Sequence, residues 1–550
     1  MSQEVCEITD DFLAQLKQDL VCRRVGRGLA CLDHHRHLFA SLDPEQKNAA
    51  RLAGYLAQWV DIGFQRPVLV KEVVSRFSRP VRSNLPLHDY LYLRLAEGMI
   101  AMAAEATEEA IGHLDFVLGL EEQSDDRELF AIANFWKGRC LRMKGEYDAA
   151  LAYAVKGSRI ATELGHEPMA AVMRVLESWL LFQKGNVKQA LEILQEAGAV
   201  LSKTDDYLTL GNIQSSYGRI ARRQGRYQHA TENFTAAIAD YRKRDPRHRN
   251  VARTLNNLAF VKRLIALQLR RKIDADAARR RKAATRGRAS SNGGKLQQRS
   301  RFEQLRQEAQ GELAEAASIY EEYRNHHGLG SVHLNYGYIH LDNGDLEDSE
   351  SEAKTAFRLG EAKGDHILMA RARLLTCMIE NVRVEEEIGE GAEPGGHARL
   401  AQDCAQEAIE LAQHTQNRRL LADAYIWQGL TYCNRFFDDP ESARRPYDQA
   451  IALSRGNHAD GTWEDLETLR ARVLRAGRVD PVLRAWSQGS VGDRTFQQIT
   501  EQFAELIIPK VWEREGRKVS RVATRLSMSP KKVRRILSRV VRRKPPPKSG

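Results

Sequence analysis

The sequence predicts an all-α protein, built as a long stack of helical pairs followed by a small basic helical domain near the C-terminus. Three observations predict this. One pattern of small and large apolar residues recurs every 40 residues through most of the chain. Two short stretches near the C-terminus have apolar residues at i, i+3, i+4 and i+7, the spacing of one buried helix face. A chain of 550 residues with 42% apolar content is also too long for a single core.

Positive charge is concentrated in two segments of the chain. There are 84 Lys and Arg against 73 Asp and Glu, a net charge of +11. Residues 517–548 contain 13 basic residues and no acidic ones, and residues 270–301 contain 12 basic and two acidic residues. The rest of the chain is therefore acidic, and these two segments are the candidates for contact with an anionic partner.

The spacing of the cysteines and the absence of membrane, metal and catalytic motifs indicate which class of protein to expect. The seven cysteines are scattered, odd in number and never spaced as C-x-x-C, which fits a reducing cytoplasm better than a disulfide framework. No apolar run is long enough to cross a membrane or to act as a signal peptide. His34, His35 and His37 lack a nearby residue to complete a tetrahedral metal site, so surface histidines are expected. Without catalytic motifs, we expect a cytoplasmic non-enzyme with no cofactor and no metal.

Residues 1–85 are predicted to form an N-terminal helical cap region. They are amphipathic at helical spacing but do not follow the 40-residue pattern. Within them, Val68 to Phe77 resembles a degenerate second helix of a repeat, which would cap the stack.

The repeats occupy residues 86–457, and we count eight of them between about residues 88 and 454. The clearest copy has Gly218, Gly225, Tyr227, Ala230, Phe234 and Ala237 at fixed offsets. Forty residues earlier stand Ser178, Gly185, Val187, Ala190, Leu194 and Ala197, and eighty earlier Gly138, Gly145, Tyr147, Ala150, Ala154 and Gly157. Small residues at such spacing let two antiparallel helices pack closely while a large side chain fills the groove.

These residues resemble the tetratricopeptide (TPR) pattern, in the longer-helix form found in bacterial signal-sensing regulators. The resemblance implies a TPR-like α-solenoid superhelix whose concave face, lined by the first helix of each pair, binds a protein, peptide or small signal. Family positions then mark Arg139, Arg142, Arg219, Arg222 and Arg223 as a ligand face for an acidic peptide or a carboxylate. The alternative is that these arginines are solvated surface residues.

Two insertions interrupt the repeats. The basic segment, at about residues 270–301, falls between the two helices of one repeat and is predicted to be a loop. It is either a disordered, charge-solvated loop or an auxiliary phosphate-binding segment. A second, short insertion at about residues 384–397 is rich in Gly and Glu.

After a helix and hinge linker at residues 458–494, residues 495–544 are predicted to fold as a separate domain, and residues 545–550 as a disordered tail. Val519, Val522, Ala523 and Leu526 form one apolar face, and Val533, Ile536, Leu537 and Val540 form another. Between them, Ser529 is placed as an N-cap and Pro530 as the first residue of a new helix.

This stretch, about residues 517–537, resembles the Fis-type helix-turn-helix at the C-termini of bacterial enhancer-binding activators. It departs from that family at Ser527, where a turn Gly is usual, and at Lys518, where an Asn is frequent. The resemblance implies a homodimer that pairs through Phe496, Ile499, Phe503, Leu506, Ile507 and Val511, with Pro509 bending that helix. The expected DNA-binding residues are Arg521, Arg525, Ser529, Lys531, Lys532, Arg534, Arg535, Ser538 and Arg539.

The sequence therefore predicts a sequence-specific DNA-binding transcriptional regulator, with double-stranded DNA and a ligand of the solenoid as partners and no membrane association. The alternative is a TPR protein-interaction adaptor whose basic segments bind nucleic acid without specificity, or whose basic terminus is a solvated tail. RNA is a further alternative, although no aromatic residue for base stacking lies between Lys518 and Arg539.

Overall fold

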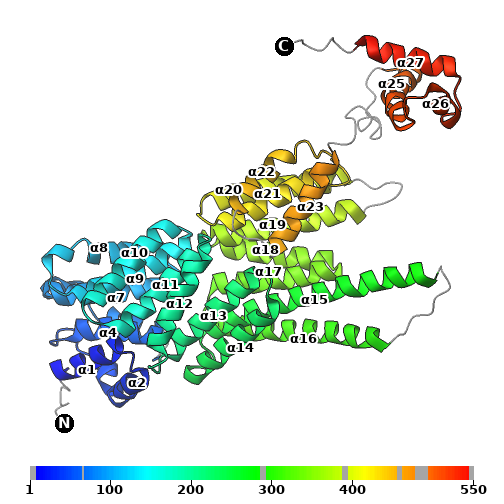
Figure 1. The fold of residues 1–550 in the computed structure, drawn as a ribbon. Helices are drawn as coiled ribbons and strands as arrows, with labels where there is room; N and C mark the ends of the chain where they lie inside the picture. Colours follow the sequence, from blue (N-terminus) through cyan, green and yellow to red (C-terminus); the bar gives the residue numbers. More distant parts are fainter. Residues whose placement is uncertain are drawn as a thin grey trace. The chain divides into compact units, whose positions relative to one another are not determined.

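A computed structural model describes residues 8–64, 67–284, 293–386, 394–454, 461–476 and 494–543, and within these ranges every regular element is a helix (Figure 1). The chain divides into two compact units, residues 1–470 and 471–550. No helix in the described ranges is long and apolar enough to cross a lipid bilayer.

Eight antiparallel helix pairs make up most of the first unit, as the repeat predicts, and they stack into a TPR-like superhelix (Figure 1). The first four pairs are α7 (Leu87–Ala103) with α8 (Thr107–Leu118), α9 (Arg127–Lys144) with α10 (Tyr147–Glu163), α11 (Glu167–Gln183) with α12 (Val187–Leu201), and α13 (Tyr207–Arg223) with α14 (Tyr227–Arg244). The last four are α15 (Arg249–Ala284) with α16 (Gly293–Glu322), α17 (His326–Asn343) with α18 (Leu346–Glu361), α19 (His366–Glu386) with α20 (Pro394–Gln413), and α21 (Arg418–Tyr432) with α22 (Arg444–Ser454). A short 3₁₀ turn, η1 (Glu121–Gln123), precedes α9, and α23 (Gly461–Ala476) follows α22.

The 40-residue pattern sets where the helices begin. Helices α9, α11 and α13 begin 40 residues apart, and so do their partners α10, α12 and α14. The carboxylate of Asp126 accepts a hydrogen bond from the Leu129 amide at 3.1 Å, and Asp206 does the same for Thr209 at 3.0 Å. Each carboxylate satisfies an amide that the first helical turn leaves unpaired, so these caps fix the starts of α9 and α13.

Close packing between the two helices of a pair explains why the repeat has small residues at fixed positions. A Cβ atom at Gly157 of α10 would lie 2.9 Å from the carbonyl oxygen of Ala131 in α9. Ala150 and Ala154, on the same helix, are fully buried. The small side chains thus let the two backbones approach to a distance that larger residues would prevent.

Six helices precede the repeats: α1 (Asp10–Val21), α2 (Val25–His34), α3 (Arg36–Ala40), α4 (Ala49–Asp61), α5 (Pro67–Ser75) and α6 (Arg79–Asn84). Helices α4 and α5 pack against α7, the first helix of the first repeat. The carboxylate of Asp205, before α13, accepts hydrogen bonds from the amides of Val25 and Gly26 at 2.7 and 2.6 Å. This region therefore covers the first repeat and also contacts the fourth.

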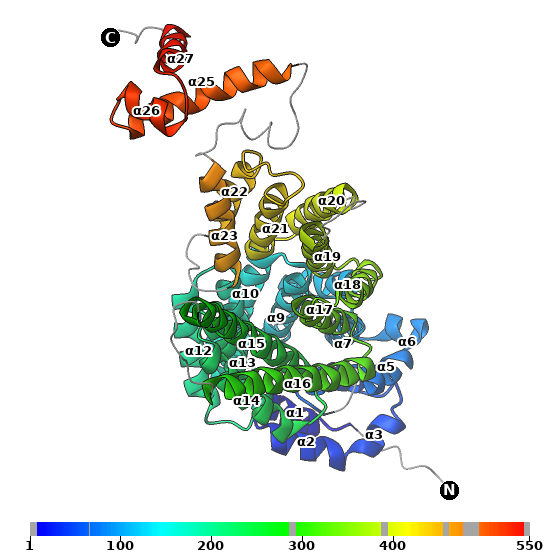
Figure 2. The same ribbon diagram turned by 90° about the vertical axis from the view of Figure 1, so that its right-hand side faces the viewer.

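The superhelix curls until turns of its first half touch turns of its second half (Figure 2). The carboxylate of Glu105, between α7 and α8, accepts a hydrogen bond from the His326 amide at the start of α17, at 2.9 Å. The carbonyl oxygen of Gly145, after α9, accepts one from the Gln416 amide at 2.9 Å. These contacts enclose the inner face formed by the first helices of the pairs.

The basic segment differs from the predicted loop, since helix covers most of it. Helix α15 continues to Ala284 and α16 resumes at Gly293, and the two project beyond the neighbouring pairs (Figure 1). Alanine, arginine and lysine have high helix propensity, which favours helix over loop in this segment. The middle of this segment, residues 285–292, lies outside the described residues. The centre of the second insertion, residues 387–393, also lies outside them, as do most of the expected hinge and the expected C-terminal tail.

Candidate nucleic-acid interface and ligand cavity

The second unit contains three described helices, α25 (Phe496–Arg514), α26 (Val519–Arg525) and α27 (Pro530–Arg543). They share a small core of Ile508, Val522, Ala523, Val533 and Ile536, all at most 5% exposed. The buried residues of α26 and α27 fall on the apolar faces expected from the sequence. The opposite face of α27 is therefore turned away from this core.

The turn between α26 and α27 uses Ser527 in a left-handed conformation, with φ +50°. A side chain at positive φ costs about 1 kcal/mol relative to glycine. The turn is closed by a hydrogen bond from the Met528 amide to the Ala523 carbonyl oxygen at 2.9 Å. The hydroxyl of Ser529 then accepts a hydrogen bond from the Lys532 amide at 3.3 Å, the N-cap that the sequence predicts for α27.

The exposed face of α27 carries four cations, Lys531, Lys532, Arg534 and Arg535. Among the described residues, none of their side chains forms an intramolecular ion pair or hydrogen bond, and Arg521 of α26 is equally unpaired and exposed. Arg525 and Arg539 differ: Arg525 pairs with Glu515, and Arg539 pairs with Glu501 at 3.4 Å. The nine residues expected to bind DNA thus separate into free cations, two paired arginines, and the hydroxyls of Ser529 and Ser538.

Helix α25 leaves part of its apolar surface exposed. Phe496 is 85% exposed and Phe503 is 48% exposed. Val511, which the sequence assigned to the same surface, instead packs against the core of the unit. The apolar face of α25 that does not pack on this core therefore consists of five of the six residues expected there, the exposed Phe496 and Phe503 with the half-buried Ile499, Leu506 and Ile507.

A second candidate site is a cavity of about 110 Å³ on the inner face of the superhelix. We call it the arginine cavity. Residues from α4, α9, α11, α13 and α15 line it. Its apolar wall consists of Ile62, Phe135, Val172, Val175, Leu176, Trp179 and Leu208, and its charged residues are Arg23, Arg139, Arg142, Arg219, Arg249, Arg253, Asp61 and Asp206.

Six arginines and two aspartates make the arginine cavity strongly positive. Asp61 pairs with Arg139 at 2.7 Å and with Arg249 at 2.9 Å. Burial raises the pKa of Asp61, but the two guanidinium groups outweigh burial and hold it below its usual value. Burial and the charge of Arg249 lower the pKa of His248 to about 3, so this neighbour adds no charge at neutral pH.

Arg23 pairs with Asp206 at 3.6 Å, whereas Arg142, Arg219 and Arg253 form no ion pair with a carboxylate among the described residues. Burial, together with nearby guanidinium groups that include that of Arg253, lowers the pKa of both Arg142 and Arg219 to about 9. The guanidinium of Arg142 lies over the ring of Trp179, 5.1 Å from its centroid. A site with this charge is suited to an anion.

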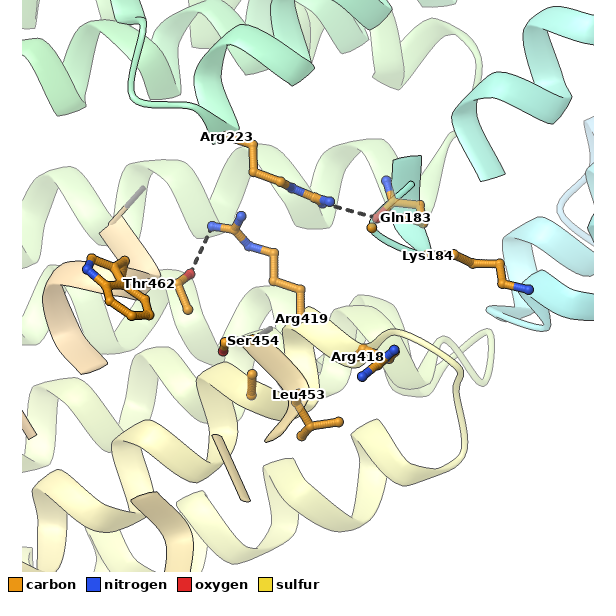
Figure 3. Close-up of a pocket in the computed structure, with 11 residues that line it drawn as sticks. Gln183, Lys184, Arg223, Arg418, Arg419, Leu453, Ser454 and Thr462 are labelled. Atoms are coloured by element: carbon orange, nitrogen blue, oxygen red, sulfur yellow. Dashed lines mark hydrogen bonds between the residues drawn. The ribbon is translucent and has the colours of Figure 1, made fainter. Parts of the chain in front are cut away.

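The structure brings only part of the predicted arginine face together. Arg139, Arg142 and Arg219 line the cavity, whereas Arg222 donates a hydrogen bond to Asn257 at 3.0 Å. Arg223 lies in a smaller pocket of about 30 Å³, beside Arg419, where it donates to Gln183 at 3.3 Å and to the Phe182 carbonyl oxygen at 3.0 Å (Figure 3). Arg222 and Arg223 are one helical turn further along α13, which places them outside the cavity.

Sequence reasoning missed Arg249, Arg253 and Asp61. Arg249 and Arg253 stand one turn apart on the inner face of α15, so extending the inner stripe of each first helix at a spacing of three or four residues would have found them. No such signal marks Asp61. It lies in the region without repeats, and its partners are 78 and 188 residues away.

No protein-family profile matches the chain, and no curated protein matches it. Several solved structures do. A Rap protein complexed with competence and sporulation factor is 13% identical, with 74% of this chain and 98% of that one covered and a TM-score of 0.49. The human IFIT1 dimer with m7Gppp-AAAA is 12% identical, with 86% and 97% covered and a TM-score of 0.45. The apo quorum sensor NprR from B. thuringiensis is 13% identical, with 81% and 98% covered and a TM-score of 0.38. At these identities and scores, the similarity says nothing about ligands or partners.

Proposed function

We propose that this protein is a sequence-specific DNA-binding transcriptional regulator whose solenoid binds a signal. The observation that carries the proposal is the exposed cationic face of α27, which consists of Lys531, Lys532, Arg534 and Arg535. The opposite face of this helix, with Val533 and Ile536, is buried in the core of the unit. Entry into a major groove requires a short helix that packs on the rest of its domain through one face and exposes cations on the other.

The arrangement of α26 and α27 supports the helix-turn-helix assignment. The two helices pack on α25 and are joined by four residues with a left-handed Ser527. We assign α27 as the recognition helix, in the manner of the Fis type. It spans about 21 Å at 1.5 Å per residue, enough for its first two turns to reach base edges while later residues contact phosphates.

The cations of this unit differ in their proposed roles. Four cations are unpaired and lie near the start of α27, and we assign them to base edges and the nearest phosphates: Lys531, Lys532, Arg534 and Arg535. Arg521 is assigned to a phosphate. Arg525 and Arg539 must first leave Glu515 and Glu501, so they contribute less to affinity.

The exposed apolar face of α25 supports a homodimer. Phe496 and Phe503 lie seven residues apart, two helical turns on one side of the helix. We propose that two copies pair through this face and place two α27 helices on successive half-sites of one duplex.

The test uses the full-length chain. Duplexes selected from a random pool are measured by fluorescence anisotropy in competition with bulk DNA, and we expect a preference of roughly a thousandfold for the selected sequence. Replacing Arg534 and Arg535 by Glu should abolish binding. A matched control, Lys188→Glu with Lys203→Glu on exposed positions of the solenoid, changes the net charge equally and should leave binding intact.

Equal binding of selected and bulk DNA would contradict the proposal and favour the adaptor with non-specific basic segments. Unchanged binding by the Arg534→Glu, Arg535→Glu variant would show that α27 is not the DNA-binding helix. Preference for single-stranded RNA over duplex DNA would likewise contradict it.

A further inference from the structure

Neutral oxygen atoms, and no carboxylates, orient two arginines of the cavity. The guanidinium of Arg219 donates to the hydroxyl of Ser215 at 3.1 Å, and that of Arg253 donates to the side-chain oxygen of Asn212 at 2.8 Å. That Asn212 oxygen also accepts from the Tyr241 hydroxyl at 3.0 Å, which fixes its position. These acceptors hold the arginines in place and leave their charge uncompensated.

Uncompensated charge in a desolvated place costs stability in the free protein. The side-chain Nε atoms of Arg219 and Arg253 are buried without a hydrogen-bond partner. Arg142 contacts the face of Trp179, which is a weak substitute for an anion. A bound anion would remove this cost by pairing with all three groups.

We propose that the arginine cavity binds a small molecule carrying a phosphate monoester, with its phosphate among Arg142, Arg219 and Arg253. This deepens the proposed function, on which it rests, by naming the class of signal that the solenoid binds. A phosphate monoester brings close to two negative charges and three terminal oxygens at neutral pH, so each guanidinium can pair with one oxygen. A carboxylate brings one charge and two oxygens and leaves one arginine unpaired.

The cavity wall indicates what the phosphate is attached to. Val172, Leu176 and Leu208 form an apolar surface next to the arginines, and the ring of Trp179 completes it. A planar or apolar group of the ligand would bury against this wall. Inorganic phosphate should therefore bind, but more weakly than an aromatic phosphate ester.

An extended acidic peptide fits the structure less well. Such a peptide would need cations spread along the superhelix, yet Arg222 and Arg223 are engaged with Asn257 and Gln183 outside the cavity. The arginines without a carboxylate partner, Arg142, Arg219 and Arg253, instead line one cavity of about 110 Å³. The observations thus favour one compact polyanionic group.

The experiment is isothermal titration calorimetry of the full-length chain with four probes: phenyl phosphate, inorganic phosphate, benzoate and a tetraglutamate peptide. Phenyl phosphate should bind most tightly, and benzoate and the peptide should bind at least about tenfold more weakly. Arg219→Met and Arg253→Met should each weaken phenyl phosphate binding by about 10- to 100-fold. The control Arg174→Gln, on the outer surface of α11, should bind as the wild type does.

Thermal melting separates loss of the site from loss of the fold. Without ligand, Arg219→Met should melt at the same temperature as the wild type or higher, because it removes an uncompensated charge. Phenyl phosphate should raise the melting temperature of the wild type and leave that of the variant unchanged.

Three results would overturn the proposal: no binding of either phosphate probe, tighter binding of the peptide than of phenyl phosphate, or full affinity in a correctly folded Arg219→Met chain. None of these measurements involves DNA. If the chain binds DNA but not the phosphate probes, only the proposal of a phosphate monoester as the signal is overturned. If it binds phenyl phosphate but not DNA, only the proposal of a DNA-binding regulator is overturned.

Discussion

The carboxylate of Asp61, at the end of α4, accepts hydrogen bonds from both terminal nitrogens of Arg139 in α9, at 2.7 and 3.1 Å. The same carboxylate accepts a third hydrogen bond from Arg249 of α15, at 2.9 Å. One side chain from the region without repeats therefore links two repeats that are far apart in the sequence. It also supplies the negative charge that balances this side of the arginine cavity.

Asp61→Asn should lower stability and strengthen anion binding. The amide keeps the shape but loses the charge that holds Arg139 and Arg249, so the melting temperature at pH 7 should fall by roughly 2–5 °C. With the competing carboxylate gone, affinity for phenyl phosphate should rise severalfold. Differential scanning fluorimetry and titration calorimetry measure the two effects.

The pH dependence checks the cause of this effect. The pKa of Asp61 is below its usual value, so its stabilising charge is present above about pH 4 and is lost as the pH falls further. The difference in melting temperature between wild type and Asp61→Asn should therefore be constant from pH 5 to 8 and should shrink at lower pH. A difference that grows on acidification would contradict the role given to this carboxylate.

Replacing Gly157 by Ala should destabilise the protein by about 1–3 kcal/mol, because the new Cβ would lie 2.9 Å from the Ala131 carbonyl oxygen and force α9 and α10 apart. Gly112 is the matched control. It also lies inside a second helix, α8, but a Cβ there meets nothing within 4 Å. Gly112→Ala should stabilise the protein by up to about 1 kcal/mol, through helix propensity alone. Chemical denaturation measures both, and equal effects would mean that the close helix packing is not limiting.

The repeat made much of the fold predictable, since the spacing of residues such as Gly138 and Ala150 reflects contacts between neighbouring helices. Such contacts are local, and they repeat. The basic segment was predicted wrongly as a loop because its charge and its place between two helices of a repeat outweighed the helix propensity of its Ala, Arg and Lys residues.

The arginine cavity was predictable only in part, because only some of its residues belong to the repeat. Arg139 and Arg219 occupy equivalent positions two repeats apart, which the pattern reveals. Asp61 meets Arg249 only because the superhelix and the region before it fold over the same inner face. No local or periodic feature of the sequence encodes that contact.

Stability should also depend on Asp465 of α23 near neutral pH. Burial, with the nearby charges of Asp423 and Glu464, raises the pKa of Asp465 to about 7, although Arg271 and Arg263 act in the opposite direction. A carboxyl whose folded-state pKa is raised is penalised once it ionises, so its stability contribution falls as the pH rises from about 4 through 7. Asp465→Asn should therefore raise the melting temperature at pH 8 and have little effect at pH 4. A melting difference that is independent of pH would contradict this reasoning.

The salt dependence of DNA binding should distinguish free from paired cations on α27. Each phosphate contact contributes about −0.9 to the slope of log affinity against log salt concentration. Arg534→Ala should reduce the slope by about that amount. Arg539→Ala should reduce it less, because Arg539 exchanges Glu501 for a phosphate. Anisotropy titrations of the full-length chain at several salt concentrations measure the slopes, and equal reductions for the two variants would contradict the distinction.

Phe503→Glu should separate dimerisation from folding in the C-terminal unit. Phe503 is 48% exposed and belongs to the outer face of α25, whereas Ile508, five residues further on, is buried in the core. A charge at Phe503 therefore lies in solvent in a monomer but would be buried without a partner in the proposed dimer. Analytical ultracentrifugation should show a dimer for the wild type and a monomer for the variant, with unchanged helix content. Affinity for a single half-site should persist in the variant, and the gain from a second half-site should be lost. A wild-type chain that sediments as a monomer, or a variant that still pairs, would assign the exposed face of α25 to some other partner.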